Sequence, residues 1–131
     1  MQGRSIARGI GSGELLVSPA PISFLSGVDP ETGIVVERGH PLEGILIAGR
    51  VLAFEFGKGS TVGSYVLYAL SRNGHAPAAL VNKDAEPIIV TGAILGRIPM
   101  IDHIDISHLR SGVKATVNGD TGELLYEDEL T

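Results

Sequence analysis

The sequence predicts a mixed α/β domain that is rich in strands and holds about two helices. Three observations lead to this prediction. Short apolar runs bounded by glycine or proline recur along the chain, which is typical of strands. Between two of these runs, apolar residues recur every four positions, which indicates a helix. The resulting strand–helix–strand order favours a parallel pair of strands.

The N-terminal part is expected to consist of strands and turns. We expect a hairpin whose strands cover residues 6–10 and 14–17, joined by a turn that contains two glycines. Two further strands are expected at residues 22–25 and 34–36, with a turn at residues 29–33 between them.

The middle of the chain combines a strand, a tight loop and a helix. The run 50–56 contains no glycine or proline and predicts a strand. The loop Gly57-Lys58-Gly59-Ser60 follows, and the apolar spacing from Val62 to Leu70 predicts a helix that begins at residue 61. Ser60 suits the N-cap of this helix, and Asn73-Gly74 suits its end.

The C-terminal part repeats the alternation of strand and helix. A strand is expected at residues 78–81, a helix at 88–95 after a proline, and a strand at 98–101. A closing hairpin is expected with strands at residues 113–117 and 123–126, since an Asn-Gly turn follows the first of them.

Composition limits the function classes. The chain has 131 residues, of which 44% are hydrophobic and 5% aromatic, without tryptophan. We therefore expect a single domain over residues 1–131 with an aliphatic core. The net charge is −5 and no Lys/Arg cluster is present. This argues against nucleic acid or a membrane surface as a partner.

Metal ligation by this chain is not expected. The sequence has no cysteine, which excludes disulfides and thiolate ligation of zinc or an iron–sulfur cluster. The four histidines are scattered without a metal-ligand spacing. The N-terminus lacks a long apolar segment and no run is long enough to span a membrane, so a cytoplasmic protein is expected.

The loop Gly57-Lys58-Gly59-Ser60 is the strongest candidate site. Its glycines let the backbone bend sharply and let a ligand approach closely. The unpaired N–H groups of the following helix start, together with Lys58, favour a carboxylate or phosphate group there. The spacing of a Walker A loop is absent. The alternative is that Ser60 only caps the helix and that Lys58 is solvated.

Ser60 could also act as a base toward a C–H acid. Nearby N–H donors and Lys58 would favour its alkoxide over the alcohol. No Ser-His-Asp or G-x-S-x-G pattern surrounds it, so acyl transfer is not indicated.

A second candidate segment runs from Ser23 to Asp29 and mixes hydroxyl groups, a carboxylate and a glycine. Its alternative interpretation is a turn with an aspartate cap. His40, which precedes a proline in a loop, is expected to be structural or solvated. The remaining titratable residues considered are expected to be solvated at the surface: Asp102, His103, Asp105, His108 and the tail 127–129.

Several stretches together resemble the small subunit of the aconitase X family. The resemblance covers the chain from about residue 4 to residue 126, and several long matches in order are more specific than any single loop. It is carried by PISFLSGVDP at 21–30, HPLEG at 40–44, GRVLAFEFGKGSTVGSYVLYAL at 49–70, NGHAPAAL at 73–80 and GAI at 92–94.

The resemblance implies a swivelling β/β/α domain that closes over a small anionic substrate and supplies Ser60 as the catalytic base. A separate large, cysteine-containing subunit is then expected to bind an iron–sulfur cluster. Ordinary aconitases have an arginine two residues beyond their serine, where this chain has Val62, so their carboxylate clamp does not carry over. The candidates for substrate binding are Lys58, Gly59, Thr61, Ser64, Ser23 and Asp29.

The chemistry that the resemblance implies is loss of water from a 3-hydroxy acid, with an iron of the cluster as Lewis acid. Family members convert (R)-5-phosphomevalonate to trans-anhydromevalonate 5-phosphate in an archaeal mevalonate pathway, or dehydrate cis-3-hydroxy-L-proline. A third hypothesis is a non-catalytic swivelling or assembly domain, in which the 57–60 loop is only a turn and a cap. In the first two cases, segments 23–29 and 57–64 should face the large subunit.

Overall fold

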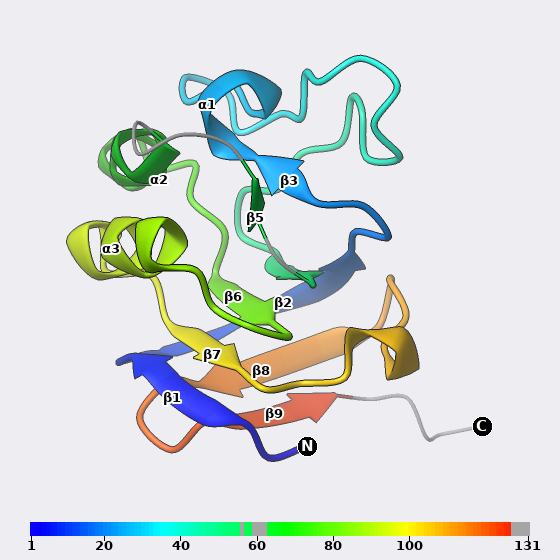
Figure 1. The fold of residues 1–131 in the computed structure, drawn as a ribbon, viewed down its shortest axis with the longest axis vertical. Coiled ribbons are helices and arrows are strands. Elements are labelled where there is room, and N and C mark those ends of the chain that lie inside the picture. The colour runs from blue at the N-terminus through cyan, green and yellow to red at the C-terminus, as the bar shows by residue number, and fades with distance from the viewer. Residues whose placement is uncertain (56, 59–62, 127–131) are drawn as a thin grey trace.

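The fold is built around one mixed seven-stranded sheet, here described in a computed structural model for residues 1–55, 57–58 and 63–126 (Figure 1). Within these residues the sheet has the order β1-β7-β6-β4-β2-β8-β9. Its strands are β1 (Arg4–Ala7), β2 (Ile10–Val17), β4 (Val51–Phe54), β6 (Ala79–Asn82), β7 (Met100–Asp102), β8 (Lys114–Asn118) and β9 (Glu123–Tyr126). The other elements are the strand pair β3 (Ile22–Ser23) and β5 (Gly57–Lys58), the helices α1 (Phe24–Gly27), α2 (Gly63–Arg72) and α3 (Pro87–Gly96), and the 3-10 turn η1 (Ile106–His108).

The centre of the sheet is parallel. Strand β4 lies between β2 and β6, and β6 pairs with β7, all running in the same direction. Every residue of β4 and β6 is buried, as expected for parallel strands that are covered on both faces. The helices α2 and α3 connect these strands and lie side by side over one face (Figure 1).

The antiparallel strands turn the sheet into a nearly closed layer. The long strand β2 pairs with β4 through residues 15–17 and with β8 through residues 10–14. Strand β9 continues from β8, and the isolated bridge Gln2–Glu123 connects the two edges of the sheet. The result is a β/β/α arrangement, in which the exposed sheet edges are paired rather than left open.

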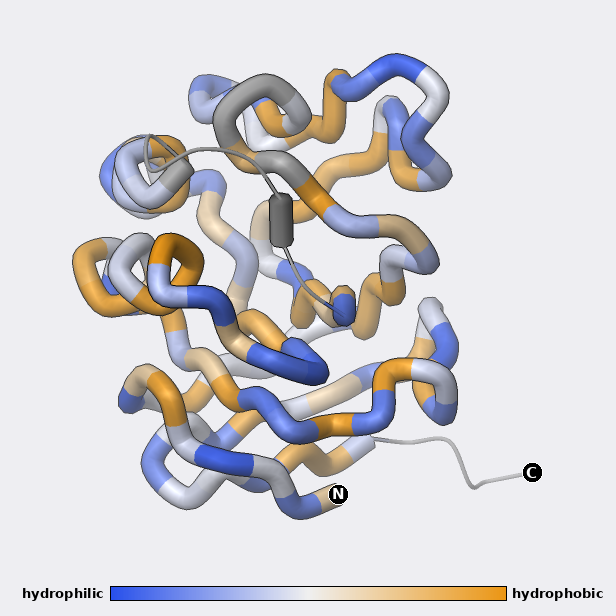
Figure 2. Tube along the Cα trace, viewed as in Figure 1, coloured by the Kyte–Doolittle hydropathy of each residue, from blue (hydrophilic) through white to orange (hydrophobic). Residues whose placement is uncertain are grey.

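Two apolar cores lie on the two faces of the parallel strands. Side chains alternate along β4, so that Leu52 and Phe54 join the core under the helices, and Val51 and Ala53 join the core between the sheet layers. Figure 2 shows apolar residues along the central strands and along α3. As expected from the composition, both cores are mostly aliphatic, with Phe24 and Phe54 as the large aromatic side chains in the first.

The hairpin predicted at residues 6–17 is wrong. Strand β1 pairs with β7, and β2 runs straight through Gly11 and Gly13. A side chain at either glycine would collide with a backbone carbonyl, that of Ala78 or that of Gly49. These glycines therefore serve close packing against neighbouring backbone and do not form a turn.

The segment between β2 and β4 is less regular than predicted. The strand expected at 22–25 ends at Ser23, where the short helix α1 begins. The strand expected at 34–36 is reduced to isolated bridges made by Ile34 and Val35. The turn at 29–33 is confirmed, since the Gly33 N–H donates to the Asp29 carbonyl at 2.7 Å.

The prediction is most accurate for the strand–helix alternation after residue 50. The expected strands and the closing hairpin correspond to β4, β6, β7, β8 and β9, with ends shifted by a few residues. Helix α2 ends where Gly74 takes a left-handed conformation, as predicted. Helix α3 ends at Gly96, one residue later than predicted, and the next residue, Arg97, takes the left-handed conformation that a glycine often has at this position.

Candidate active site at the carboxyl edge of the parallel strands

The carboxyl ends of the parallel strands β2, β4, β6 and β7 lie on the same side of the sheet. We call this side the carboxyl edge, in distinction from the lateral edges formed by β1 and β9. In open α/β sheets, ligands bind outside this edge. The predicted loop 57–60 follows β4 and therefore leaves from it. Its first two residues form β5, which pairs in parallel with β3 so that Ser23 lies opposite Lys58. The fold thus brings together two candidate segments that are 35 positions apart in sequence.

The predicted site residues have different outcomes. Gly59, Ser60 and Thr61 lie outside the described residues. Ser64 is buried in the first turn of α2, at 7% exposure, where α2 packs closely against Gly92 of α3. The Asp29 carboxylate accepts the Glu31 N–H at 2.9 Å, which is the local turn that the alternative interpretation expected.

His40 is a structural residue, as one of the two expectations had it. It is buried, its Nε2 lies 3.1 Å from the Pro21 carbonyl oxygen, and its Nδ1 accepts the Leu42 N–H at 3.0 Å. The ring therefore ties the 40–44 loop to the residue that precedes β3. In this way it supports the segment that carries Ser23.

The three residues that directly follow β4, β6 and β7 are Glu55, Lys83 and His103, and we call them the strand exits. They continue the backbone hydrogen bonding past the end of the sheet. The Lys83 N–H donates to the Glu55 carbonyl at 3.1 Å, and the His103 N–H donates to the Lys83 carbonyl at 2.9 Å. Each of the three residues directly follows a buried stretch at the end of β4, β6 or β7, and each is exposed. Neither Glu55 nor Lys83 was expected from the sequence, because Glu55 falls inside the strand predicted at 50–56 and Lys83 lies two residues after the strand predicted at 78–81.

Asp102 corrects the prediction of a solvated carboxylate, because its side chain is fully buried. Arg4 binds it with two hydrogen bonds of 2.9 and 2.8 Å, and the Ala85 N–H donates to it at 2.9 Å. Burial alone would raise the pKa of this carboxyl. The hydrogen bonds from Arg4 and Ala85 outweigh the burial and hold its pKa below the ordinary value.

The histidines at this edge and the neighbouring Asp105 are exposed, as predicted. His103 has a left-handed backbone with φ of 62°, and its Nε2 lies 3.9 Å from the Asp102 carboxylate. Asp105 accepts hydrogen bonds from the Ser107 hydroxyl and N–H and lies 3.1 Å from His108 Nε2. The hydrogen bonds from Ser107 are the main reason that the pKa of Asp105 is lowered.

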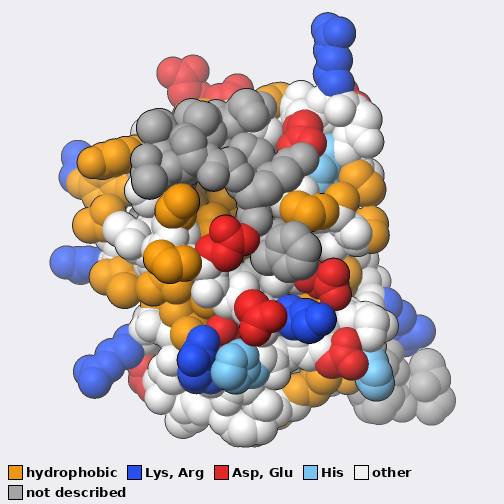
Figure 3. All heavy atoms as spheres, viewed as in Figure 1, with side chains coloured by type: hydrophobic (Ala, Val, Ile, Leu, Met, Phe, Trp, Pro, Cys, Tyr) orange, Lys and Arg blue, Asp and Glu red, His pale blue; other side chains and the backbone are white. Residues whose placement is uncertain are grey.

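The surface beside these strand exits is hollowed. A depression of about 540 Å³, which we call the carboxyl-edge hollow, is lined by Glu55, Lys83, Asp84, His103, Ile104, Asp105 and Ser107. A second depression of about 370 Å³ shares Glu55 and Ser107 with it and extends to Val17 at the end of β2. Figure 3 shows acidic, basic and histidine side chains gathered where β6 and β7 end.

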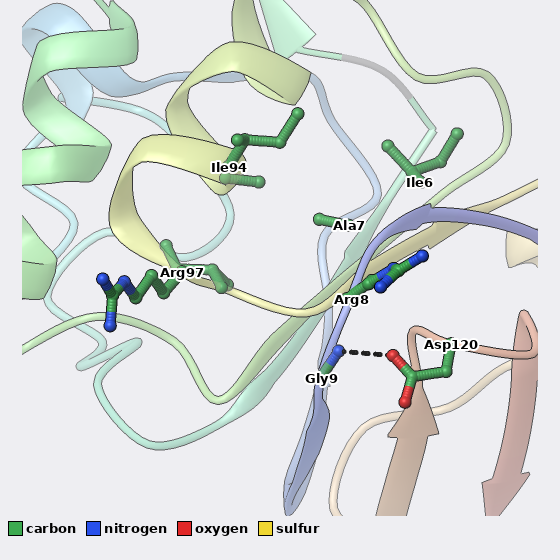
Figure 4. Close-up of a pocket in the computed structure, with 9 residues that line it drawn as sticks. Ile6, Ala7, Arg8, Gly9, Ile94, Arg97 and Asp120 are labelled. Atoms are coloured by element: carbon green, nitrogen blue, oxygen red, sulfur yellow. Dashed lines mark hydrogen bonds between the residues drawn. The ribbon is translucent and has the colours of Figure 1, made fainter.

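The opposite edge of the parallel strands has its own depression, the amino-edge hollow, of about 640 Å³ (Figure 4). It lies between the C-terminus of α3, the end of β1 and the turn between β8 and β9. Ile6 and Ile94 face it, and Arg8 and Arg97 extend away from it in different directions. Asp120 accepts the Gly9 N–H at 3.1 Å, so this carboxylate is engaged in holding the turn.

The chain does not fit an iron–sulfur cluster as its own cofactor. It contains no cysteine. In the part of the chain that the structure describes, no group of three or more histidine and carboxylate side chains could hold a metal ion. Nor does any described helix combine the length and apolarity needed to cross a membrane.

The layered fold, with helices and a curled antiparallel ribbon on the two sides of parallel strands, defines a swivel domain of the aconitase type. The family model "Aconitase X swivel domain" matches residues 1–126, and the chain belongs to this family.

Relatives of known name and structure are similar over almost the full length. A Thermococcus onnurineus protein named phosphomevalonate dehydratase small subunit is 53% identical, with 98% of each chain covered. A Methanosarcina acetivorans protein of the same name is 52% identical over 93% of this chain and 87% of that protein. The crystal structure of Thermococcus kodakaraensis aconitase X in its holo form matches with a TM-score of 0.94 at 50% identity, over 97% of each chain.

Proposed function

We propose that this chain is the small subunit of a hydro-lyase that dehydrates (R)-5-phosphomevalonate to trans-anhydromevalonate 5-phosphate. One observation carries the proposal: archaeal relatives from Thermococcus and Methanosarcina that bear this name are more than half identical to the chain over nearly its whole length. The fold, with a glycine-rich loop leaving the carboxyl edge, agrees with such a role.

In this proposal, Ser60 accepts the proton from the carbon next to the substrate carboxylate. The electron pair of the broken C–H bond forms the new C=C bond, and the hydroxyl leaves the neighbouring carbon as hydroxide. Regeneration of the Ser60 base releases the abstracted proton, which balances the hydroxide as water. In the sequence, Ser60 comes two residues after the end of β5, and the pairing of β5 with β3 fixes where the loop starts. Lys58, Gly59, Thr61, Ser64, Ser23 and Asp29 are proposed to contact the substrate or to shape the loops that do.

A large subunit is required to complete this active site. We propose that it provides the cysteine ligands of an iron–sulfur cluster, which would supply Lewis acidity toward the departing hydroxyl. The segments 23–29 and 57–64 are proposed to face this subunit, because the base must reach a substrate held there. We place the assembled enzyme in the cytoplasm.

The test is reconstitution with a cysteine-containing large subunit. The two chains should co-purify and together convert phosphomevalonate to the anhydro acid, as followed by mass spectrometry. Each chain alone should be inactive. Dehydration by the small subunit without a partner would contradict the proposal.

Two comparisons in the same assay separate the alternatives. If the complex dehydrates cis-3-hydroxy-L-proline and leaves phosphomevalonate unchanged, the chain serves the other reaction of the family. If the complex is active but Ser60→Ala leaves its kcat unchanged, the domain is an assembly subunit and the loop is only a turn and a cap.

A further inference from the structure

We propose that Lys83 and His103, in the carboxyl-edge hollow, bind the phosphate group of the substrate. This inference rests on the proposed function and adds a binding site for the end of the substrate that is remote from the reacting carbons. Neither residue was among the candidates found from the sequence.

The placement follows from the backbone of the strand exits. Lys83 is hydrogen-bonded through its N–H to Glu55, the last described residue before the loop region that begins at position 56. His103 is hydrogen-bonded in turn to Lys83. The two side chains therefore belong to the same edge of the sheet as the loop after β4, on neighbouring strands spaced by about 5 Å.

Two of the titratable side chains that line the hollow, those of Asp105 and His103, have close partners. Asp105 is bound by Ser107 and His108. Among the described residues, the Asp84 and Glu55 side chains form no hydrogen bond or ion pair, and Asp84 makes only the smallest contribution to the raised pKa of Arg4. Lys83 likewise has no hydrogen bond or ion pair through its side chain within the part of the chain that the structure describes, and its charge is the smallest of the causes that lower the pKa of Asp105. Lys83 is thus a cation at this edge that remains available for an anionic ligand.

His103 is held in a conformation that most side chains avoid. Its φ of 62° places it in the left-handed region, which is unfavourable for residues other than glycine. Residues in such conformations cluster at ligand sites, because the surrounding structure must maintain them. The Asp102 carboxylate lies 3.9 Å from His103 Nε2, and His103 lines the hollow.

The chemistry of the substrate assigns the phosphate to this position. The proton is removed next to the carboxylate, so the carboxylate end must lie at the loop that carries Ser60. The phosphate is at the other end of the molecule. The phosphate therefore needs a binding site separate from that of the carboxylate. Lys83 can provide a positive charge there, and His103 can provide an N–H donor. Glu55 is a carboxylate in the same hollow and would compete with the phosphate for Lys83.

The experiment is steady-state dehydration of phosphomevalonate by the two-subunit complex. Lys83→Ala should raise KM about tenfold while kcat stays within about twofold, because it removes a charged contact to a non-reacting group. His103→Gly, which suits the left-handed backbone, should raise KM by a smaller factor. Glu55→Gln should lower KM, since it removes the competing charge. Inorganic phosphate should inhibit the wild-type complex competitively and the Lys83→Ala complex less.

Arg8→Ala at the amino-edge hollow is the matched control and should change none of these quantities. An unchanged KM in an active Lys83→Ala complex overturns the inference. A fall in kcat alone, or loss of co-purification with the large subunit, also overturns it, because the residue then serves assembly or positioning. A wild-type complex that leaves phosphomevalonate unchanged fails already at the proposed function, and the inference fails with it.

Discussion

The two edges of the parallel strands differ in what they present to the surface. The carboxyl edge presents Glu55, Lys83 and His103 in a row of hydrogen-bonded strand exits, next to the loop that carries the proposed base. The amino edge presents an apolar hollow whose arginines extend away from each other (Figure 4). Both edges use a non-glycine residue in the left-handed conformation, Arg97 on one and His103 on the other.

The two depressions lie at opposite ends of the same parallel strands but are lined by side chains of different kinds. The amino-edge hollow has the larger volume, but its one described carboxylate, Asp120, already holds a turn. The carboxyl-edge hollow combines charges of both signs on consecutive parallel strands. We expect substitutions at the carboxyl edge to change catalysis and those at the amino edge to change only stability.

The largest effect is expected for Ser60→Ala, which should lower kcat of the two-subunit complex by about 10²-fold or more, because it removes the general base. As a helix cap, the same serine would account for only about 1 kcal/mol of stability. Ser60→Asn separates the two roles, because asparagine caps helices about as well as serine. It should restore the melting temperature and leave the complex inactive. Normal turnover by the Asn variant would place the base elsewhere.

Asp102→Ala should be the most destabilising of the substitutions considered for the two edges. It removes two hydrogen bonds from Arg4 and one from Ala85 to a buried carboxylate, which should cost about 3 kcal/mol in urea unfolding. Asp120→Ala at the amino edge is the control. It loses one exposed hydrogen bond and should change stability by about 0.5 kcal/mol. If both variants lose the same free energy of unfolding, the buried Asp102 carboxylate contributes no more to stability than the exposed Asp120 carboxylate.

The same carboxylate should make stability sensitive to acid. Its pKa in the folded protein is lowered, so its contribution is present above the pKa of about 3.9 in the unfolded chain. It is lost progressively as the pH falls below about 4 toward the lower pKa of the folded state. Unfolding measured between neutral pH and pH 3 should therefore show a smaller acid loss for Asp102→Asn than for the wild type.

Gly92→Ala tests whether the packing of the helices supports the carboxyl edge. A Cβ at this position would lie 2.6 Å from Leu67 Cδ1 and 3.1 Å from Ser64 Cα, so α2 and α3 would have to move apart. The expected cost is about 1–3 kcal/mol. Because α2 begins directly after the loop, kcat should fall as well. Thr91→Ala on the exposed side of α3 should leave activity unchanged. Full activity in Gly92→Ala would show that the loop does not depend on the close packing of α2 against α3.

The smallest effect is expected at the left-handed residues themselves. Arg97→Gly should raise stability by about 0.5 kcal/mol, because glycine occupies this conformation without steric cost. Its KM and kcat should equal those of the wild type. His103→Gly relieves the same backbone cost but should weaken substrate binding. If both variants behave alike in the activity assay, the proposed difference between the edges is wrong.

Local periodicity predicted much of the fold. The strand at β4, the helix after it, the second helix with its initial proline and the closing hairpin each follow from spacing over fewer than about 15 residues. The failures have a tertiary cause. Gly11 and Gly13 are indicative of a turn in isolation, but here they allow β2 to pass close to the backbone of its neighbours.

The candidate site was predicted in part. The resemblance to the family pointed to Ser60 and Lys58 as site residues. In the structure, the pairing of β3 with β5 places Ser23 opposite Lys58. Glu55, Lys83 and His103 were not assembled from the sequence, because they are far apart along the chain. Only the alignment of three parallel strands makes them neighbours.

The sequence by itself determined the class of fold, the family and the lack of cysteine ligands in this chain, because composition, local spacing and long ordered matches are properties of the chain alone. The tertiary structure decided which polar residues are buried, as for Asp102, and which strand exits share an edge. Those properties depend on contacts between residues distant in sequence. Arg4 and Asp102, which are 98 positions apart, meet only because β1 pairs with β7.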